Sequence, residues 1–416
     1  MFDPSADDNR AIRLAAENGH IAVVERLLLD VRVDPSANSN LAVRLAAVRG
    51  RFAVVKRLLQ DQRVDPSAKG NFAVRWAAEN GHLAVVELLL QDERVDPSAN
   101  GNYTVGMAAW NGHHAVVERL LHDKRVDPSA DDNCAVRLAA QNGHVAVVEL
   151  LLQDQRVDPA AGDNYAVRRA AEHGHHAVVE RLLQDKRVDP TAYYNHAVRS
   201  AAQNGHLAVI ELLLQEKRVD PSVISNDALR QAAKNGHLTV VECLLQDQRV
   251  DPSVHSNHAI RLAAEYGHLA VVERLLQDVR VDPSDDGNIA IQVAASSGHL
   301  AVVERLLQDL RVDPSADDND AVRQAAQCGH FAVVDRLLED NRVDFAVAIR
   351  SCSPENRKRF ECRERLTEIC IALQDLELPA WVTIKILYAA RPWSTLPLHS
   401  KWNLVCAVKH YHDKEQ

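Results

Sequence analysis

Four histidines lie close together near the middle of the chain. His173, His175 and His176 fall within residues 172–183 (EHGHHAVVERLL), and His196 follows. Histidine is the commonest metal ligand among neutral side chains, so this cluster is a candidate zinc site. Its spacing matches no dedicated zinc motif. We therefore expect neither a metal ion nor another cofactor.

The sequence around these histidines recurs along the chain, as NGHIAVVERLL, NGHLAVVELLL, NGHHAVVERLL and NGHVAVVELLL. An Asn marks each copy at a strict spacing of 31 residues, which gives eleven repeats. Strict repetition predicts a solenoid in which each repeat packs only on its neighbours. We expect residues 1–344 to form this array and residues 345–416 to form a helical C-terminal domain that caps it or serves as an adaptor. The marker residues are Asn9, Asn40, Asn71, Asn102, Asn133, Asn164, Asn195, Asn226, Asn257, Asn288 and Asn319.

The repetition favours a structural role for most of the histidines. His175 follows a glycine at a position that is His in ten repeats and Arg51 in the second. We therefore interpret His175 as a hydrogen-bonding residue that the repeat requires. His173 and His176 occupy positions that vary between repeats.

Each repeat predicts two short helices and a loop. Asn9 is a good N-cap for an Ala-rich first helix. Gly19 ends that helix, because glycine readily adopts the positive φ of a helix C-terminus. The second helix carries an apolar stripe and is followed by an Asp-Pro turn. In the first repeat the stripe consists of Val23, Val24, Leu27 and Leu28.

Two motifs of the repeat resemble the ankyrin repeat family. AAENGH (residues 15–20) matches the family's A-A-x-x-G-H, and AVVERLL (residues 22–28) matches its second helix. The chain departs from the family in its period of 31 instead of 33 residues, and in RAIR (residues 10–13) where the family has TPLH. The resemblance implies an all-α solenoid of stacked helix pairs with short hairpin-like loops. It also implies a protein that binds other proteins and is not an enzyme.

Composition restricts the classes of partner. The net charge is −10, and residues 345–416 carry 11 Lys and Arg against 8 Asp and Glu, so the array holds about −13. This charge argues against nonspecific nucleic-acid binding. The sequence shows no secretion signal and no long apolar span, and its seven cysteines form no CxxC pair. We expect an intracellular monomer without membrane contact, more cytoplasmic than nuclear, with reduced thiols.

Charged residues also recur at fixed positions. Arg32 and Asp34 have counterparts in every repeat, and Arg13 in all but two, where Gly106 and Gln292 replace it. These rows predict a ladder of ion pairs along the stack. Alternatively, the arginines could bind an acidic or phosphorylated partner.

The variable positions indicate where a partner could bind. The variable positions of Arg10, Leu14 and Glu17 lie on one face of the first helix. Large aromatic residues concentrate there and in the adjoining loops of repeats three to seven, so we expect this region to be the partner surface. Alternatively, these side chains fill space between neighbouring first helices, but we expect Tyr103, Trp110, Tyr193 and Tyr194 to be exposed. The candidate partner-binding residues are Phe72, Trp76, Tyr103, Met107, Trp110, Tyr165, Tyr193 and Tyr194.

The C-terminal region raises a second hypothesis, a substrate-recognition adaptor that recruits a ubiquitin ligase. LPAWVTIKIL resembles the start of an F-box, and Leu366 with Cys370 resembles a SOCS-type box. Alternatively, the apolar residues of this region form a helical capping core. The chain contains no phosphate loop, H-E-x-x-H motif or nucleophile elbow, so nothing indicates catalysis. The candidate ligase-docking residues are Leu378, Pro379, Val382, Ile386 and Leu387.

Overall fold

The computed structural model describes residues 3–344 and residue 347. Apart from residue 347, the predicted C-terminal domain of residues 345–416 lies outside the described part of the chain. The candidate ligase-docking residues also lie outside it, so their role stays a prediction. They are Leu378, Pro379, Val382, Ile386 and Leu387.

The described residues form eleven helix pairs, one per repeat, and contain no strand. This confirms the predicted all-α architecture. None of these helices has the length and apolar character that a membrane span needs. The first helices of the pairs are α1 (Ala6–Asn18), α3 (Ala37–Val48), α5 (Ala68–Glu79), α7 (Ala99–Trp110), α9 (Ala130–Gln141), α11 (Ala161–Glu172), α13 (Ala192–Gln203), α15 (Val223–Lys234), α17 (Val254–Glu265), α19 (Asp285–Ser296) and α21 (Ala316–Cys328). The second helices are α2 (Ile21–Leu28), α4 (Phe52–Leu59), α6 (Leu83–Leu89), α8 (His114–Leu121), α10 (Val145–Leu151), α12 (His176–Leu183), α14 (Leu207–Gln215), α16 (Leu238–Leu245), α18 (Leu269–Leu276), α20 (Leu300–Leu307) and α22 (Phe331–Leu337).

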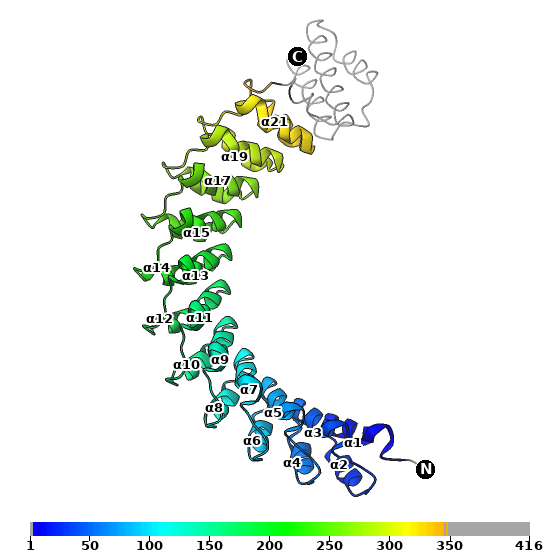
Figure 1. Cartoon of the computed structure of the whole chain (residues 1–416). Helices are drawn as coiled ribbons and strands as arrows, with labels where there is room; N and C mark the ends of the chain where they lie inside the picture. Colours follow the sequence, from blue (N-terminus) through cyan, green and yellow to red (C-terminus); the bar gives the residue numbers. More distant parts are fainter. Residues whose placement is uncertain (1–2, 345–346, 348–416) are drawn as a thin grey trace, which may run out of the picture. The chain divides into compact units, whose positions relative to one another are not determined.

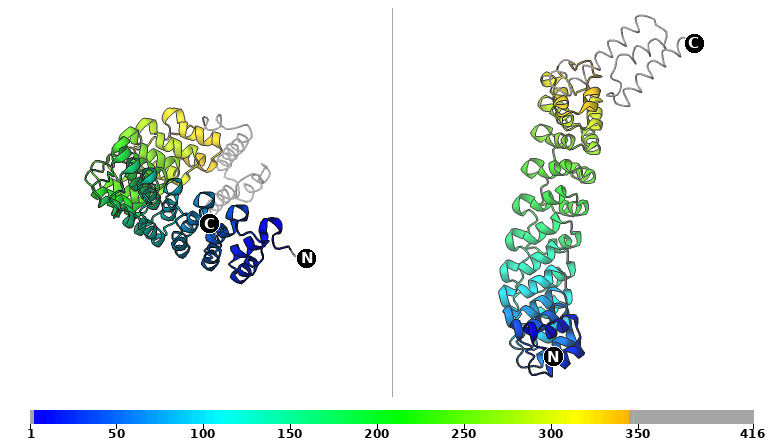
Figure 2. Two further views of the ribbon diagram at one scale, coloured as in Figure 1. Left: turned by 60° about the horizontal axis from the view of Figure 1, so that its bottom comes forward. Right: turned by 90° about the vertical axis from the view of Figure 1, so that its right-hand side faces the viewer.

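The chain divides into two compact units between the eighth and ninth repeats. The first unit is Met1–Pro252, with α1 to α16, and the second is Ser253–Gln416, with α17 to α22. Within each unit, every first helix packs on the first helix of the next repeat, and the second helices do the same. Figures 1 and 2 show this order in the first unit, from blue to green. The strict repeat spacing does not signal the boundary between the units.

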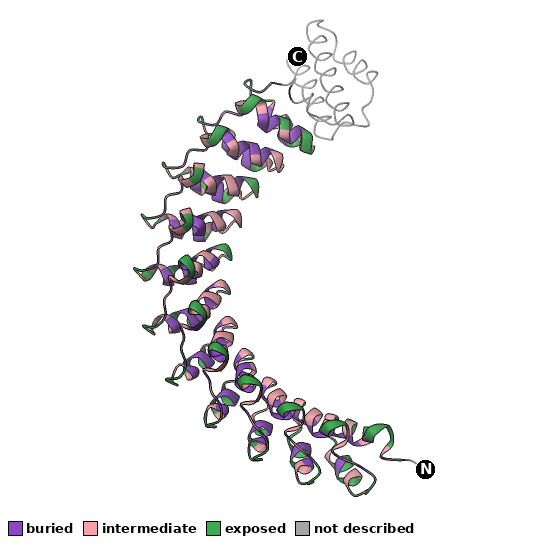
Figure 3. Cartoon of the chain, viewed as in Figure 1, coloured by how far each residue is buried: buried purple, intermediate pink, exposed green. Residues whose placement is uncertain are grey.

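From the second repeat on, each pair buries the first three positions of the predicted apolar stripe together with alanines of the first helix, whereas in the first repeat Val23 is 48% exposed and only Val24 of the stripe is buried. In the third repeat, Ala77 and Ala78 of α5 and Val85, Val86 and Leu89 of α6 are at most 1% exposed. The small alanines let neighbouring first helices approach closely. Burying each larger side chain stabilises the stack by roughly 1.5–3 kcal/mol. Figure 3 shows buried residues where helices face one another, and exposed residues at the loop tips.

A left-handed turn lies at the start of every first helix. Its three residues, which are Asp7, Asp8 and Asn9 in the first repeat, have φ between 51° and 68° in all eleven repeats. A left-handed residue other than glycine costs roughly 1–2 kcal/mol, and Asn and Asp tolerate this conformation best. This explains why Asp, Asn and Gly predominate at the two positions before the marker Asn.

The marker Asn closes this turn onto the loop that ends the same repeat. Its side-chain Oδ1 accepts a hydrogen bond from the backbone N–H of the Asp 25 residues later, as Asn9 does from Asp34. The bond recurs in all eleven repeats, at 2.7 to 3.2 Å. The prediction that Asn9 is an N-cap is therefore wrong, because Asn9 is left-handed and α1 has no side-chain cap bond.

The arginine row that includes Arg13 serves the left-handed turn. Arg44 donates hydrogen bonds to the turn carbonyls of Ser39 and Asn38, at 2.9 and 3.0 Å. These carbonyls lie five and six residues before the arginine. The equivalent carbonyls bind Arg168 and Arg230 in their own repeats. The row therefore does not form the regular ion-pair ladder that the sequence suggested.

The arginine row that includes Arg32 links successive repeats, and the predicted ion pair with the Asp34 row occurs in some of them. The guanidinium groups of Arg156, Arg218 and Arg342 lie 3.9 Å from the carboxylates of Asp127, Asp189 and Asp313 in the preceding repeat. Arg63 binds both carboxylate oxygens of Asp61, two residues earlier, and donates to the carbonyl of Val33 in the preceding repeat at 3.0 Å. The Asp34 carboxylate instead accepts bonds from the backbone and hydroxyl of Ser36. In most repeats the charged row thus provides a clamp within the loop and a hydrogen bond to the preceding repeat.

The Gly-His histidines form a second connection between repeats. Nε2 of His175 donates to the carbonyl of Gln141, 34 residues earlier, at 2.9 Å, which confirms its predicted role. Burial lowers the pKa of His175, which favours its neutral form. In the second repeat, Nε of Arg51 donates the equivalent hydrogen bond to the backbone carbonyl of Glu17 at 3.1 Å. Arginine can thus replace histidine here because it offers an N–H at the same place.

Replacing the marker Asn71 by alanine should destabilise the array by about 2 kcal/mol. The change removes the Asn71 Oδ1, which accepts a hydrogen bond from the backbone amide of Asp96 at 2.8 Å, and leaves that amide without an acceptor. It also forces alanine into a left-handed conformation. Asn71→Asp keeps an acceptor and should lose less stability. Urea unfolding and hydrogen exchange at the Asp96 amide would measure both effects. Unchanged exchange of that amide in the alanine variant would contradict this account.

Glycine before the histidine should be required for space as well as for its φ. A Cβ on Gly112 would lie 2.5 Å from Nδ1 of His144, whereas a Cβ on Gly101 would meet no atom within 4 Å. Both glycines have positive φ, at 73° and 66°. Gly101→Ala should therefore cost about 1 kcal/mol of stability, and Gly112→Ala about 1–3 kcal/mol more. Equal shifts in urea midpoint would show that the close approach to His144 is unimportant.

The loop clamps should make stability fall in acid. Hydrogen bonds from Arg125 hold the pKa of Asp123 below its ordinary value. The unfolded chain therefore binds a proton at Asp123 more tightly than the folded chain does. The clamp's contribution to stability is present above about pH 4 and is lost as the pH falls through the folded pKa. Asp123→Asn should lower stability by at most about 1 kcal/mol at pH 7 and by less at pH 3. Urea midpoints at the two pH values test this, and an equal loss at both would contradict it.

Candidate protein-binding surface

The eight candidate partner-binding residues all lie on first helices of the first unit. They belong to α5, α7, α11 and α13. Phe72 and Trp76 of α5 stack with their ring centroids 5.3 Å apart. We call this set the aromatic face; it consists of Phe72, Trp76, Tyr103, Met107, Trp110, Tyr165, Tyr193 and Tyr194.

Arginines cover four rings of the aromatic face, those of Phe72, Tyr103, Tyr165 and Tyr193. The guanidinium of Arg75 lies 5.3 Å from the ring centroid of Tyr103, and that of Arg168 lies 4.7 Å from Tyr193. In each case the arginine comes from the repeat before the ring. Such cation–π contacts contribute about 0.5–1 kcal/mol at exposed sites and fix the ring orientation. The arginines and the aromatic residues are both visible in the sequence, but only the structure shows that the arginines lie over the rings.

The burial of these residues separates two groups. Tyr193 and Tyr194 are 59% and 75% exposed, as expected. Tyr103 and Trp110 were also expected to be exposed but are half-buried. Tyr103 packs under Arg75. Its burial, and to a smaller extent the negative charge of Glu79, raises the pKa of its phenol. The remaining members, Phe72, Trp76, Met107 and Tyr165, are also half-buried.

The backbone at the two exposed tyrosines is strained. Tyr193 and Tyr194 occupy the left-handed turn of the seventh repeat, with φ of 57° and 58°. Bulky residues rarely adopt this conformation, and such outliers concentrate at functional sites. Ile224 holds the equivalent place in the next repeat, with φ of 52° and 47% exposure, and the sequence gave no reason to select it.

The histidine cluster is not assembled into a metal site. The rings of His173 and His175 lie 6.0 Å apart, and the Nε2 of His175 is engaged by a carbonyl. His196 is half-buried. This burial, and to a smaller extent the positive charge of Arg168, lowers the pKa of His196. Within residues 3–344, no group of three or more His, Cys, Asp or Glu is arranged to hold a metal ion.

Comparison with known protein families agrees with this geometry. The family model for ankyrin repeats, which describes three copies, matches six overlapping stretches: residues 12–101, 76–163, 105–194, 168–256, 197–284 and 260–348. No curated protein shows significant similarity to the chain. Ankyrin repeats are modules of protein–protein interaction. The stacked helix pairs, the Gly-His histidines and this match over most of the sequence show that the chain belongs to the ankyrin repeat family.

Proposed function

We propose that this chain is a noncatalytic scaffold that binds a protein partner through the aromatic face, with Tyr193 and Tyr194 as its main contact residues. The observation that carries this proposal is the conformation of these two residues. Both are large, exposed and held in a left-handed turn for which Asp, Asn or Gly would be more stable. Within the repeat, the contact of Arg168 with Tyr193 contributes about 0.5–1 kcal/mol, which is less than the roughly 1–2 kcal/mol that each left-handed residue costs.

The surroundings of the tyrosines suit them to binding. Arg168 covers the ring of Tyr193, so this ring is oriented before a partner arrives. Tyrosine contributes a large contact area and a hydroxyl, and it loses little conformational entropy because it has only two side-chain torsions. Neighbouring repeats hold the rest of the face at a fixed spacing, which further lowers the entropy lost on binding.

A double substitution separates binding from folding. The fourth repeat has Asn100 and Gly101 at the equivalent turn positions, so we choose Tyr193→Asn with Tyr194→Gly. This variant should be as stable as the wild type or more stable, because both new residues tolerate the left-handed conformation. It should bind the partner at least about ten-fold more weakly. Affinity purification with mass spectrometry, followed by titration of the recovered partner, measures the loss.

A matched control checks for an effect of the turn itself. Lys69 is exposed and occupies a left-handed turn in the third repeat, with φ of 58°. Lys69→Asn relieves strain of the same kind without removing an aromatic ring, and it should leave binding unchanged. Wild-type affinity in the double tyrosine variant would refute the proposal. An equal loss in both variants would also count against it.

A further inference from the structure

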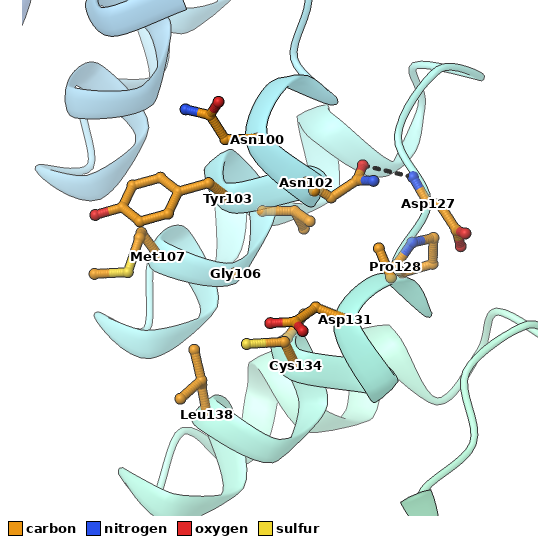
Figure 4. A pocket seen from close by; sticks show the side chains of 14 residues that line it. Asn100, Asn102, Tyr103, Gly106, Met107, Asp127, Pro128, Asp131, Cys134 and Leu138 are labelled. Carbon is orange, nitrogen blue, oxygen red and sulfur yellow. Dashed lines mark hydrogen bonds between the residues drawn. The ribbon is translucent and has the colours of Figure 1, made fainter. Parts of the chain in front are cut away.

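The fourth repeat lacks the arginine that serves its left-handed turn, and a pocket lies in its place. Gly106 of α7 occupies the position that is arginine in nine repeats and Gln292 in another. A Cβ on Gly106 would meet no atom within 4 Å. The pocket beside it has a volume of about 260 Å³ and lies between α7 and α9 (Figure 4).

The pocket retains the acceptors that an arginine uses elsewhere. Arg44 donates to the carbonyls five and six residues before it. The same offsets from Gly106 lead to the carbonyls of Gly101 and Asn100, two residues that line the pocket. Gly106 itself offers no side-chain donor to them.

The pocket also contains an acid at the place where, in two other repeats, the side chain at this position finds a partner. Arg261 binds the carboxylate of Asp286, 25 residues later, at 2.7 Å. Gln292 donates to Asp317 at the same offset, at 3.1 Å. From Gly106 this offset leads to Asp131, which lines the pocket and whose carboxylate projects from α9 in Figure 4.

A second small residue enlarges the pocket. In three repeats the arginine covers a ring 28 residues later, as Arg44 covers Phe72 at 5.0 Å and Arg137 covers Tyr165 at 4.8 Å. From Gly106 this offset leads to Cys134, whose thiol lines the pocket. Both the arginine and the ring that it would cover are thus replaced by smaller residues. Burial, and to a smaller extent the charge of Asp131, raises the pKa of the Cys134 thiol, so this thiol stays neutral.

We propose that this pocket receives an arginine side chain of the protein partner. The proposal rests on the binding function proposed above and names one group that the partner must supply. A planar guanidinium can donate to two carbonyls and a carboxylate together, which the single ammonium of lysine matches poorly. The volume is below that of most sites for drug-sized ligands and suits one side chain.

The test uses the full chain and a small probe, so it needs no natural partner. Acetyl-glycyl-arginyl-glycinamide is titrated into the protein, and binding is followed by saturation-transfer nuclear magnetic resonance of its side-chain protons. The same peptide with citrulline, which is neutral and of similar shape, serves as the ligand control. The arginine peptide should bind at least about ten-fold more tightly than the citrulline peptide, because charge-assisted hydrogen bonds are lost in the latter.

Three variants locate the binding. Gly106→Arg supplies the missing side chain from within, so it should abolish peptide binding and raise the melting temperature of the chain. Asp131→Asn leaves the backbone unchanged and should weaken binding about ten-fold. Asp7→Asn removes an acid from the same register of the first repeat and should have no effect.

The outcomes are decisive. Loss of binding in Gly106→Arg and weakening in Asp131→Asn, with wild-type behaviour of Asp7→Asn, would support an arginine pocket. Absence of binding to the wild type, or equal binding by all variants, would overturn it. If Gly106→Arg does not fold, the comparison of Asp131→Asn with Asp7→Asn still decides. A negative result leaves the tyrosine experiment untouched, since that experiment measures partner binding without reference to Gly106.

Discussion

The hydrogen bond from the marker Asn to the backbone N–H 25 residues later is the interaction on which the rest of the structure depends. It ties the left-handed turn at the start of a repeat to the loop at its end. The turn is unfavourable by itself, since most residues cost free energy in this conformation. Asn meets both requirements, because it tolerates a positive φ and its side chain carries an acceptor. Alanine would lose both the tether and the tolerance of the turn.

Connections between repeats are built from equally regular bonds. The histidine of one repeat reaches the carbonyl 34 residues earlier, and the loop arginine reaches the carbonyl 30 residues earlier. Both bonds use backbone acceptors, which are present whatever the side chain. Variable positions can therefore change without disturbing the stack. This separation of fixed backbone contacts from variable side chains allows one array to present a particular surface.

Two departures from the repeat pattern carry the functional proposals. Tyr193 and Tyr194 place bulky exposed rings where the backbone favours small polar residues. Gly106 and Cys134 remove an arginine and the ring it would cover, while the acceptors remain. One departure adds contact area, and the other opens a pocket that has the carboxylate of Asp131 in its wall. Both lie in the first unit, on first helices that belong to the same run of contacts.

The sequence by itself determined the repeat and the helix pairs, because both follow from periodic patterns that are local in the chain, and two motifs within the repeat carried the resemblance to the family. It also indicated the structural role of His175 and the exposure of Tyr193 and Tyr194. Only the tertiary structure decided which groups meet across 25 to 34 residues. The predicted cap at Asn9 assigned this residue a role that it does not have, and the predicted ion-pair ladder is present in only some repeats. The same holds for the pocket at Gly106: the sequence shows the missing arginine, but only stacked helices bring its acceptors together around the space that it leaves.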